Sequence, residues 1–169
     1  MRSEEAVFLH AYLLRQIGRE FEITRRILAA VPERSREYRP HAEARSAIEL
    51  AWHLASCEIW FYEGILHGYF GERERMPYHI RAIADVVAHY GRNVPELLAE
   101  LRKLGPEQLT RGVSLFGSES RPAVTFLSAA LAHTIHHRGQ LSAYLRAMGA
   151  PVPAVYGDGA NDSSQTASR

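Results

Sequence analysis

Residues 131–149 read LAHTIHHRGQLSAYLRAMG, and this stretch carries the strongest evidence for the fold. It is rich in Ala, Leu and Arg, which favour helix, and it ends at Gly149, a residue type common just beyond helix ends. Together with the residues before it, the stretch predicts a helix over about residues 122–148. One face of that helix is apolar except for two histidines and carries Phe126, Ala130, His133, His137, Leu141 and Tyr144.

Three further stretches that are poor in Pro and Gly have the same helical pattern. Their apolar residues recur at steps of three and four, which is the spacing of one face of an α-helix. Four amphipathic helices of similar length, with no credible strand between them, predict an all-α protein, a four-helix bundle. The other three predicted helices cover about residues 4–30, 42–67 and 77–101.

The predicted domain spans residues 1–157. Gly91 and Pro95 are expected to bend or interrupt the third helix, because proline removes a backbone donor. Residues 113–116 are too short to count as a strand. Residues 158–169 have no apolar periodicity, so we expect them to form a disordered tail.

The composition of the chain limits its class and its partners. At 169 residues, with 46% apolar and 23% charged residues, it is one globular domain. A formal net charge of +1 gives no electrostatic reason to expect a nucleic-acid partner. No apolar run approaches the ~20 residues of a bilayer span, and the N-terminus lacks the features of a signal peptide. We therefore expect a cytoplasmic protein with no membrane partner, whose only cysteine, Cys57, is a buried and inert thiol.

Two histidines of the fourth helix and one of the second are candidate metal ligands. His133 and His137 are four residues apart, so they project from the same face of a helix and can share a metal ion. Imidazoles on a core-facing surface need a partner, because unpaired buried polar groups are costly. His53 lies about eleven residues into its helix, or ~16 Å from its start, at the height of the other two. The three side chains therefore predict one site near mid-height.

Other interpretations of these histidines stay open at this point. With nine histidines in the chain, chance pairs are common, and a single core histidine is usually held by a hydrogen bond. His10, His67 and His89 are each possible fourth ligands, whereas His41 and His79 lie near helix starts and are expected at the surface. The Glu-x-x-His pairs of di-iron bundles, HExxH, P-loop, GxSxG and GxGxxG motifs are all absent.

The segment 133–157, HTIHHRGQLSAYLRAMGAPVPAVYG, closely resembles the C-terminal signature of the DinB-like (DinB/YfiT) superfamily. That signature reads H-x3-HRGQ, then an Arg, a Gly and Pro-x-x-Tyr-Gly, and residues 40–53 are similar to the family's other ligand region. The resemblance follows the helix order over nearly the whole chain. It implies a four-helix bundle with a long connection between the second and third helices. It also implies a divalent metal held by His53, His133 and His137.

The resemblance also suggests a function. Superfamily members of known activity are metal-dependent thiol transferases and isomerases that use low-molecular-weight thiols such as bacillithiol or mycothiol. We therefore expect a divalent transition metal (zinc, nickel or iron) in an open three-His site, a small-molecule substrate, and transferase or hydrolase chemistry. The alternative is a non-catalytic metal-binding protein of the stress or DNA-damage response. It stays open because Glu49 and Glu58, the nearest acidic residues, are not clearly placed at the site.

A second face of the fourth helix favours close contact with another helix. His136 lies on this face, about 100° from His137, so we do not expect it to be a ligand. Small residues let two backbones approach closely, either inside the monomer or in a homodimer, and members of the superfamily often dimerise. We therefore expect a homodimer through the small residues Ala129, Ala132, Gly139 and Ala143.

Overall fold

The computed structural model describes residues 1–73 and 75–157, so the predicted tail at residues 158–169 lies outside the described residues. A helical bundle is present, as predicted. Its four long helices are α1 (Ser3–Ala29), α2 (Ala47–His67), α3 (Ile83–Leu101) and α5 (Thr125–Ala147). The short elements are the 3-10 helix η1 (Glu33–Ser35), the helix α4 (Pro106–Thr110) and the antiparallel strands β1 (Gly112–Val113) and β2 (Arg121–Pro122).

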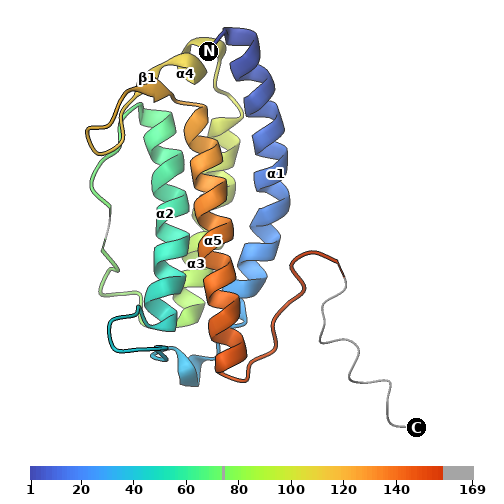
Figure 1. Ribbon diagram of the computed structural model, residues 1–169, viewed down its shortest axis with the longest axis vertical. Helices are drawn as coiled ribbons and strands as arrows, with labels where there is room; N and C mark the ends of the chain where they lie inside the picture. Colours follow the sequence, from blue (N-terminus) through green and yellow to red (C-terminus); the bar gives the residue numbers. More distant parts are fainter. Residues whose placement is uncertain (74, 158–169) are drawn as a thin grey trace.

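The helices run down, up, up and down in the view of Figure 1. Both α1 and α2 pack against α3 and α5, so α1 and α2 occupy opposite corners of the bundle. Because α2 and α3 point in the same direction, the chain between them must return along the length of the bundle, and residues 68–73 and 75–82 lie along the outside of α2 (Figure 1). This is the long connection that the family resemblance implied.

The long connection is fastened to α2 by aromatic side chains. The indole of Trp60 donates a hydrogen bond to the carbonyl of Gly71 at 2.8 Å, and its ring packs against Phe70. Phe70 lies directly over Gly64 of α2, where an added Cβ would come within 2.3 Å of the ring. The missing side chain at Gly64 therefore lets the connection lie close against the helix.

Helix α2 begins at Ala47, five residues later than predicted, because a capping box sets its start. The Ser46 hydroxyl accepts a hydrogen bond from the backbone N–H of Glu49, and the Glu49 carboxylate accepts one from the backbone N–H of Ser46. The next free N–H group, that of Ala47, donates to the carbonyl of Tyr38. Residues 42–45 favour helix by composition, but these caps leave them in the preceding loop.

Helix α3 also begins later than predicted, at Ile83, because Asp85 accepts the backbone N–H groups of Arg81 and Ala82 at 2.9 Å. The expected interruption at Pro95 does not occur, and one helix continues through it. Gly91 lies four residues before Pro95, at the position whose carbonyl group a proline ring crowds in a helix.

The sequence analysis did not anticipate α4 or the pairing of β1 with β2. The pair consists of two residues on each side, Gly112 opposite Pro122 and Val113 opposite Arg121. These elements close the end of the bundle where α5 begins (Figure 1). None of the described helices combines the length and the apolar character needed to cross a membrane.

Candidate metal centre

The three predicted histidines meet between α2 and α5. His53 comes from α2, and His133 and His137 come from successive turns of α5. One ring nitrogen of each lies within 4.8 Å of the other two, and the side chains are half-buried. Within residues 1–73 and 75–157, no other group of three His, Cys, Asp or Glu side chains comes together in this way. The sequence had placed all three at the same height of the bundle, and the structure brings them together there.

The arrangement of the nitrogens fits a divalent ion. The Nε2 atoms of His53 and His137 are 3.1 Å apart. Two nitrogens that each lie about 2.1 Å from one ion, at 90–110° to each other, are separated by about 3.0–3.4 Å. The Nδ1 atom of His133 is buried and has no hydrogen-bond partner among the described residues. Because an unpaired buried nitrogen is costly, metal binding through this Nδ1 atom would remove an otherwise unfavourable feature.

Two neighbours orient the imidazole rings. Nδ1 of His137 donates to the side-chain oxygen of Gln140 at 2.6 Å, which leaves the Nε2 atom of the neutral ring unprotonated. That Nε2 faces His53 Nε2, so His53 donates to it when no metal is bound. Nδ1 of His53 lies 3.4 Å from the sulfur of Cys57. A metal held by Nε2 of both rings requires the His53 proton on Nδ1, where it faces that sulfur.

Sequence reasoning missed the parts played by Gln140 and Cys57, although the signal was present. Gln140 lies three residues after His137, and Cys57 lies four residues after His53, so each shares a helix face with the ring that it touches. Cys57 is buried, as expected, and burial raises the pKa of its thiol. Its contact with His53 nevertheless makes it part of the site.

All three imidazoles are held in the neutral form that binds metal. Burial lowers the pKa of His53 to about 3 and that of His133 to about 4. Burial also lowers the pKa of His137. The nearby positive charge of Arg45 acts in the same direction on all three rings. At neutral pH no proton has to be displaced from a charged imidazole before metal binds.

The other candidate ligands lie elsewhere. Nε2 of His10 is hydrogen-bonded to the carbonyl of Leu101 at 2.9 Å. His67 stacks on the ring of Tyr69, and the ring of His89 packs against that of Trp52. None of these histidines belongs to the cluster. The ring of His136 contacts that of His137, but its side chain is exposed on the outside of α5.

Neither nearby carboxylate is available to the cluster. Glu58 is fully buried and accepts hydrogen bonds from the hydroxyls of Tyr62, Tyr90 and Thr134 at 2.7, 3.0 and 2.8 Å. Burial raises the pKa of Glu58 above its ordinary value in spite of these donors. Glu49 pairs with Arg39 at 2.8 Å. A general base beside the three imidazoles is therefore not provided by either residue.

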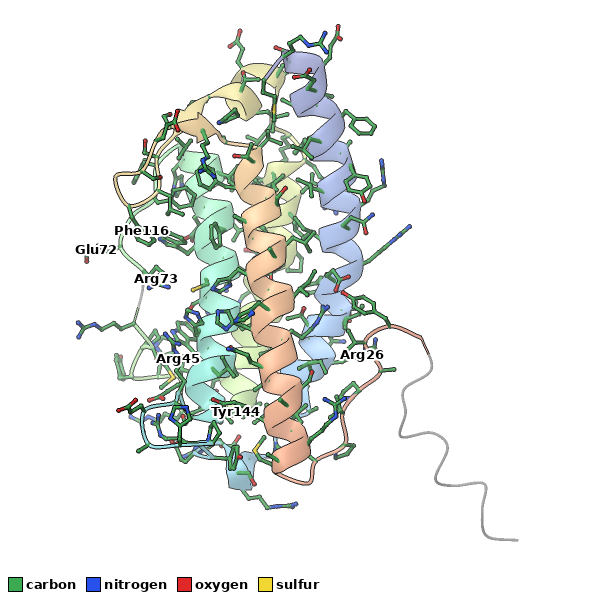
Figure 2. All side chains as sticks on the ribbon, viewed as in Figure 1. Arg26, Arg45, Glu72, Arg73, Phe116 and Tyr144 are labelled. Carbon is green, nitrogen blue, oxygen red and sulfur yellow. The ribbon has the colours of Figure 1, made fainter. Side chains whose placement is uncertain are left out.

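A cleft of about 450 Å³ opens on one side of the cluster. Figure 2 shows two of its lining residues, Arg45 and Arg73, on the same side of α2. The guanidinium of Arg73 lies 3.6 Å from the sulfur of Cys57. A second cleft, of about 520 Å³, lies against α1 beside His10 and does not include the cluster. The first cleft is lined by Trp52, His53 and Cys57 of α2, by Arg45 before it, and by Arg73 and Arg75 of the long connection.

The fold and the site together define a class of protein, the helical bundles that carry a three-histidine cluster between their second and last long helices. The chain belongs to the DinB family, whose sequence profile matches residues 6–168. None of the curated proteins compared with the chain matches it.

Solved structures show the same fold. A DinB-like protein from Bacillus cereus ATCC 10987 superposes with a TM-score of 0.73 at 24% identity, over 85% of this chain and 95% of that one. A DinB-like protein from Bacillus subtilis gives a TM-score of 0.68 at 23% identity, over 85% and 96% of the two chains. A variant of the mycothiol-dependent maleylpyruvate isomerase gives 0.52 at 13% identity, over 83% of this chain and 61% of that one.

Proposed function

We propose that this protein is a divalent-metal-dependent transferase that uses a low-molecular-weight thiol, with His53, His133 and His137 as the metal ligands. The observation that carries the proposal is the meeting of the three ring nitrogens beside a cleft of substrate size. Three neutral imidazoles leave coordination positions open, as in catalytic sites and unlike closed structural ones. The similarity in fold to a mycothiol-dependent isomerase supports a thiol as the co-substrate.

A bound divalent ion would supply Lewis acidity and lower the pKa of a thiol placed at an open position. The chain's own residues then hold and orient the reactants. Gln140 keeps the Nε2 atom of His137 turned towards the cluster, and the sulfur of Cys57 contacts Nδ1 of His53. In the transfer itself, the sulfur of the thiol forms a bond to an electrophilic carbon, the thiol proton passes to solvent, and a leaving group departs with its electron pair.

Thiol transfer fits the residues better than hydrolysis does. A hydrolase normally needs a general base next to the reacting water. Glu58 is enclosed by three hydroxyl groups, and Glu49 is paired with Arg39. A thiol whose pKa is lowered by a metal loses its proton at neutral pH without a strong base, so the lack of a free carboxylate is no obstacle.

The same lack of a base supports the second candidate function, a metal-binding protein with no catalytic activity. Such a protein would use the three histidines to hold zinc, nickel or iron during stress or DNA damage. It would bind metal as tightly as the enzyme and show no turnover with any thiol.

The test begins with protein purified without a metal-affinity column. Elemental analysis before and after incubation with zinc, nickel and iron(II) measures metal uptake. The metal-loaded protein is then assayed with bacillithiol or mycothiol as the thiol and 1-chloro-2,4-dinitrobenzene as the electrophile. In this reaction a sulfur–carbon bond replaces the carbon–chlorine bond, and chloride is released. We expect one equivalent of metal per chain and conjugation that requires it.

The controls separate the two candidate functions. The His53→Ala variant should lose both metal and conjugation, whereas His136→Ala should keep both, since its side chain lies outside the cluster. Stoichiometric metal without conjugation of either thiol would favour the non-catalytic protein. A wild-type chain that takes up none of the three metals would contradict both proposals.

A further inference from the structure

The cleft beside the cluster carries a positive charge that metal binding does not require. The guanidinium groups of Arg45, Arg73 and Arg75 line it. Among residues 1–73 and 75–157, none of the three forms an ion pair with a carboxylate, and the side-chain contact of Arg73 is to the sulfur of Cys57. Three cations that line one cleft, with no ion-pair partner among the described residues, favour the binding of an anion.

The acidic residue in the lining does not offset this charge. Oε2 of Glu49 lies 2.8 Å from the guanidinium of Arg39 and also accepts the backbone N–H of Ser46 at 2.8 Å. The pKa of Glu49 is lowered by these contacts, so it stays ionised, but its charge is balanced by Arg39. Among the described residues that line the cleft, the charges left without an ion-pair partner are therefore the three arginines.

Trp52, which carries a neutral hydrogen-bond donor, is also among the lining residues. Trp52 is 4% exposed, and its indole N–H has no hydrogen-bond partner in the part of the chain that the structure describes. A buried donor without an acceptor is costly, and a ligand rich in oxygen atoms is a suitable partner. The volume of about 450 Å³ is within the usual range for small-molecule sites.

The arginines reach the cleft from two segments that are far apart in the sequence. Arg45 precedes α2, whereas Arg73 and Arg75 belong to the connection that runs back along α2 (Figure 2). Guanidinium forks bind carboxylates and phosphates with two parallel hydrogen bonds, so several arginines in one cleft suit a molecule that carries more than one negative oxygen group. His53 lines the cleft and also belongs to the cluster, so a ligand held here lies against the metal centre.

We propose that this cleft selects a small anionic substrate, a dicarboxylate or a phosphate ester, which Arg45, Arg73 and Arg75 hold against the three-histidine centre. This assignment of substrate class rests on the proposed transferase function. In this assignment the histidines hold the metal, and the arginines hold the anionic substrate that reacts with the thiol.

Calorimetric titration tests the proposal on metal-free and zinc-loaded protein, with succinate, inorganic phosphate and uncharged succinamide as probes. We expect succinate or phosphate to bind both forms and succinamide to bind neither. The R45Q/R73Q double variant should raise the Kd of the anion at least tenfold. The matched control is R92Q, which removes an exposed arginine of α3 that does not line the cleft. All of these variants should keep the zinc content of the wild type.

The outcomes separate this proposal from the proposed function. If neither anion binds while the protein still takes up zinc and conjugates a thiol, the anion site is wrong and the transferase stands. If anion binding needs zinc and survives in R45Q/R73Q, the carboxylate sits on the metal and the arginine site is overturned. If zinc is never taken up but the anion binds through the arginines, the transferase fails and the anion site stands.

Discussion

At the residue scale, the family signature in segment 133–157 contributes both to the metal centre and to the packing of the segment after α5. His133 and His137 face the cluster, whereas Arg138 points to the other side of α5, where it is almost completely buried. Its guanidinium lies 2.5 Å from the carboxylate of Glu20 in α1, and it donates to the hydroxyl of Tyr156 at 2.8 Å. The Tyr156 hydroxyl in turn donates to Glu20 at 3.0 Å. The Arg and Tyr of the signature thus hold the segment after α5 against α1.

Replacing Arg138 with methionine is expected to destabilise the protein strongly. The change leaves the Glu20 carboxylate without its partner in a mostly buried position, and losses of this kind cost about 3–5 kcal/mol. Urea unfolding followed by circular dichroism measures the effect. Arg146→Met, at an exposed position of the same helix, is the control and should change the stability by less than about 0.5 kcal/mol. Equal effects of the two changes would show that the ion pair does not support the fold.

Single alanine substitutions distinguish the ligands from their neighbour. His53→Ala, His133→Ala and His137→Ala should each lose most of the affinity for metal, because each removes one of three nitrogens. His136→Ala should keep it, since that ring lies on the exposed side of α5. Metal titration with a competing chelator compares the four variants. If the His136 variant loses metal while the His137 variant keeps it, the wrong face of α5 has been assigned.

The low pKa values of the cluster predict how the stability of the metal-free protein depends on pH. Burial lowers the pKa of His53 to about 3 and that of His133 to about 4, whereas the same groups in the unfolded chain have pKa values near 6.5. The unfolded chain therefore binds more protons than the folded protein between about pH 3 and 6.5. The corresponding stability is complete above about pH 6.5 and is lost as the pH falls through these folded-state pKa values to about 3.

The double variant H53Q/H133Q provides the comparison for this pH dependence. It lacks the two groups whose pKa values are lowered most and keeps His137, so its free energy of unfolding should fall less than that of the wild type between pH 7 and 5. Glu58, whose raised pKa acts in the opposite direction, is present in both proteins and cancels in the difference. Parallel pH profiles of the two metal-free proteins would mean that these imidazoles are not shielded from solvent.

At the element scale, α2 is the helix around which the site is built. It is covered by α3, by α5 and by the long connection, and most of its residues are buried. It supplies His53 and Cys57, and the segments on either side of it supply the arginines of the cleft. The position of the connection therefore decides the shape of the cleft.

Adding a methyl group at Gly64 of α2 should loosen the connection. The Cβ of Gly64→Ala would come within 2.3 Å of the Phe70 ring, which must move, at a cost of about 1–3 kcal/mol. Gly18→Ala is the matched control: Gly18 lies in the middle of α1 with nothing within 4 Å of the new Cβ, so the change should stabilise the protein by ~1 kcal/mol. Thermal unfolding should shift in opposite directions for the two variants. A stabilised Gly64 variant would show that Phe70 does not pack there.

At the scale of the whole molecule, the predicted homodimer remains a prediction, but its surface is now defined. Ala132, Gly139 and Ala143 are exposed along the outer face of α5, and Ala129 is half-buried. The alternative that this strip packs inside the monomer is therefore disfavoured for the three exposed residues. We expect a dimer in sedimentation equilibrium at micromolar concentration and a monomer for Ala132→Glu, because two opposed carboxylates would be buried. A monomeric wild type would contradict the prediction.

The sequence by itself determined the helical bundle and the level at which the three histidines lie, whereas the long connection was expected only from the family resemblance. Helical periodicity places His133 and His137 on one face, and helix length places His53 at the same height, so these features depend only on local geometry. The starts of α2 and α3 were misjudged because helix propensity is a weaker determinant than a cap.

Only the tertiary structure decided what surrounds the cluster. Arg73 and Arg75 lie in a segment without regular structure, and no spacing rule relates such residues to His53, which lies 20 positions before Arg73 in the chain. Their place beside His53 follows from the parallel course of α2 and α3, which forces the connection to return along α2. The contacts of Arg138 with Glu20 and Tyr156 likewise depend on which helix corner faces α5. Long-range packing chooses these partners, because side chains far apart in the sequence meet only when the helices have docked.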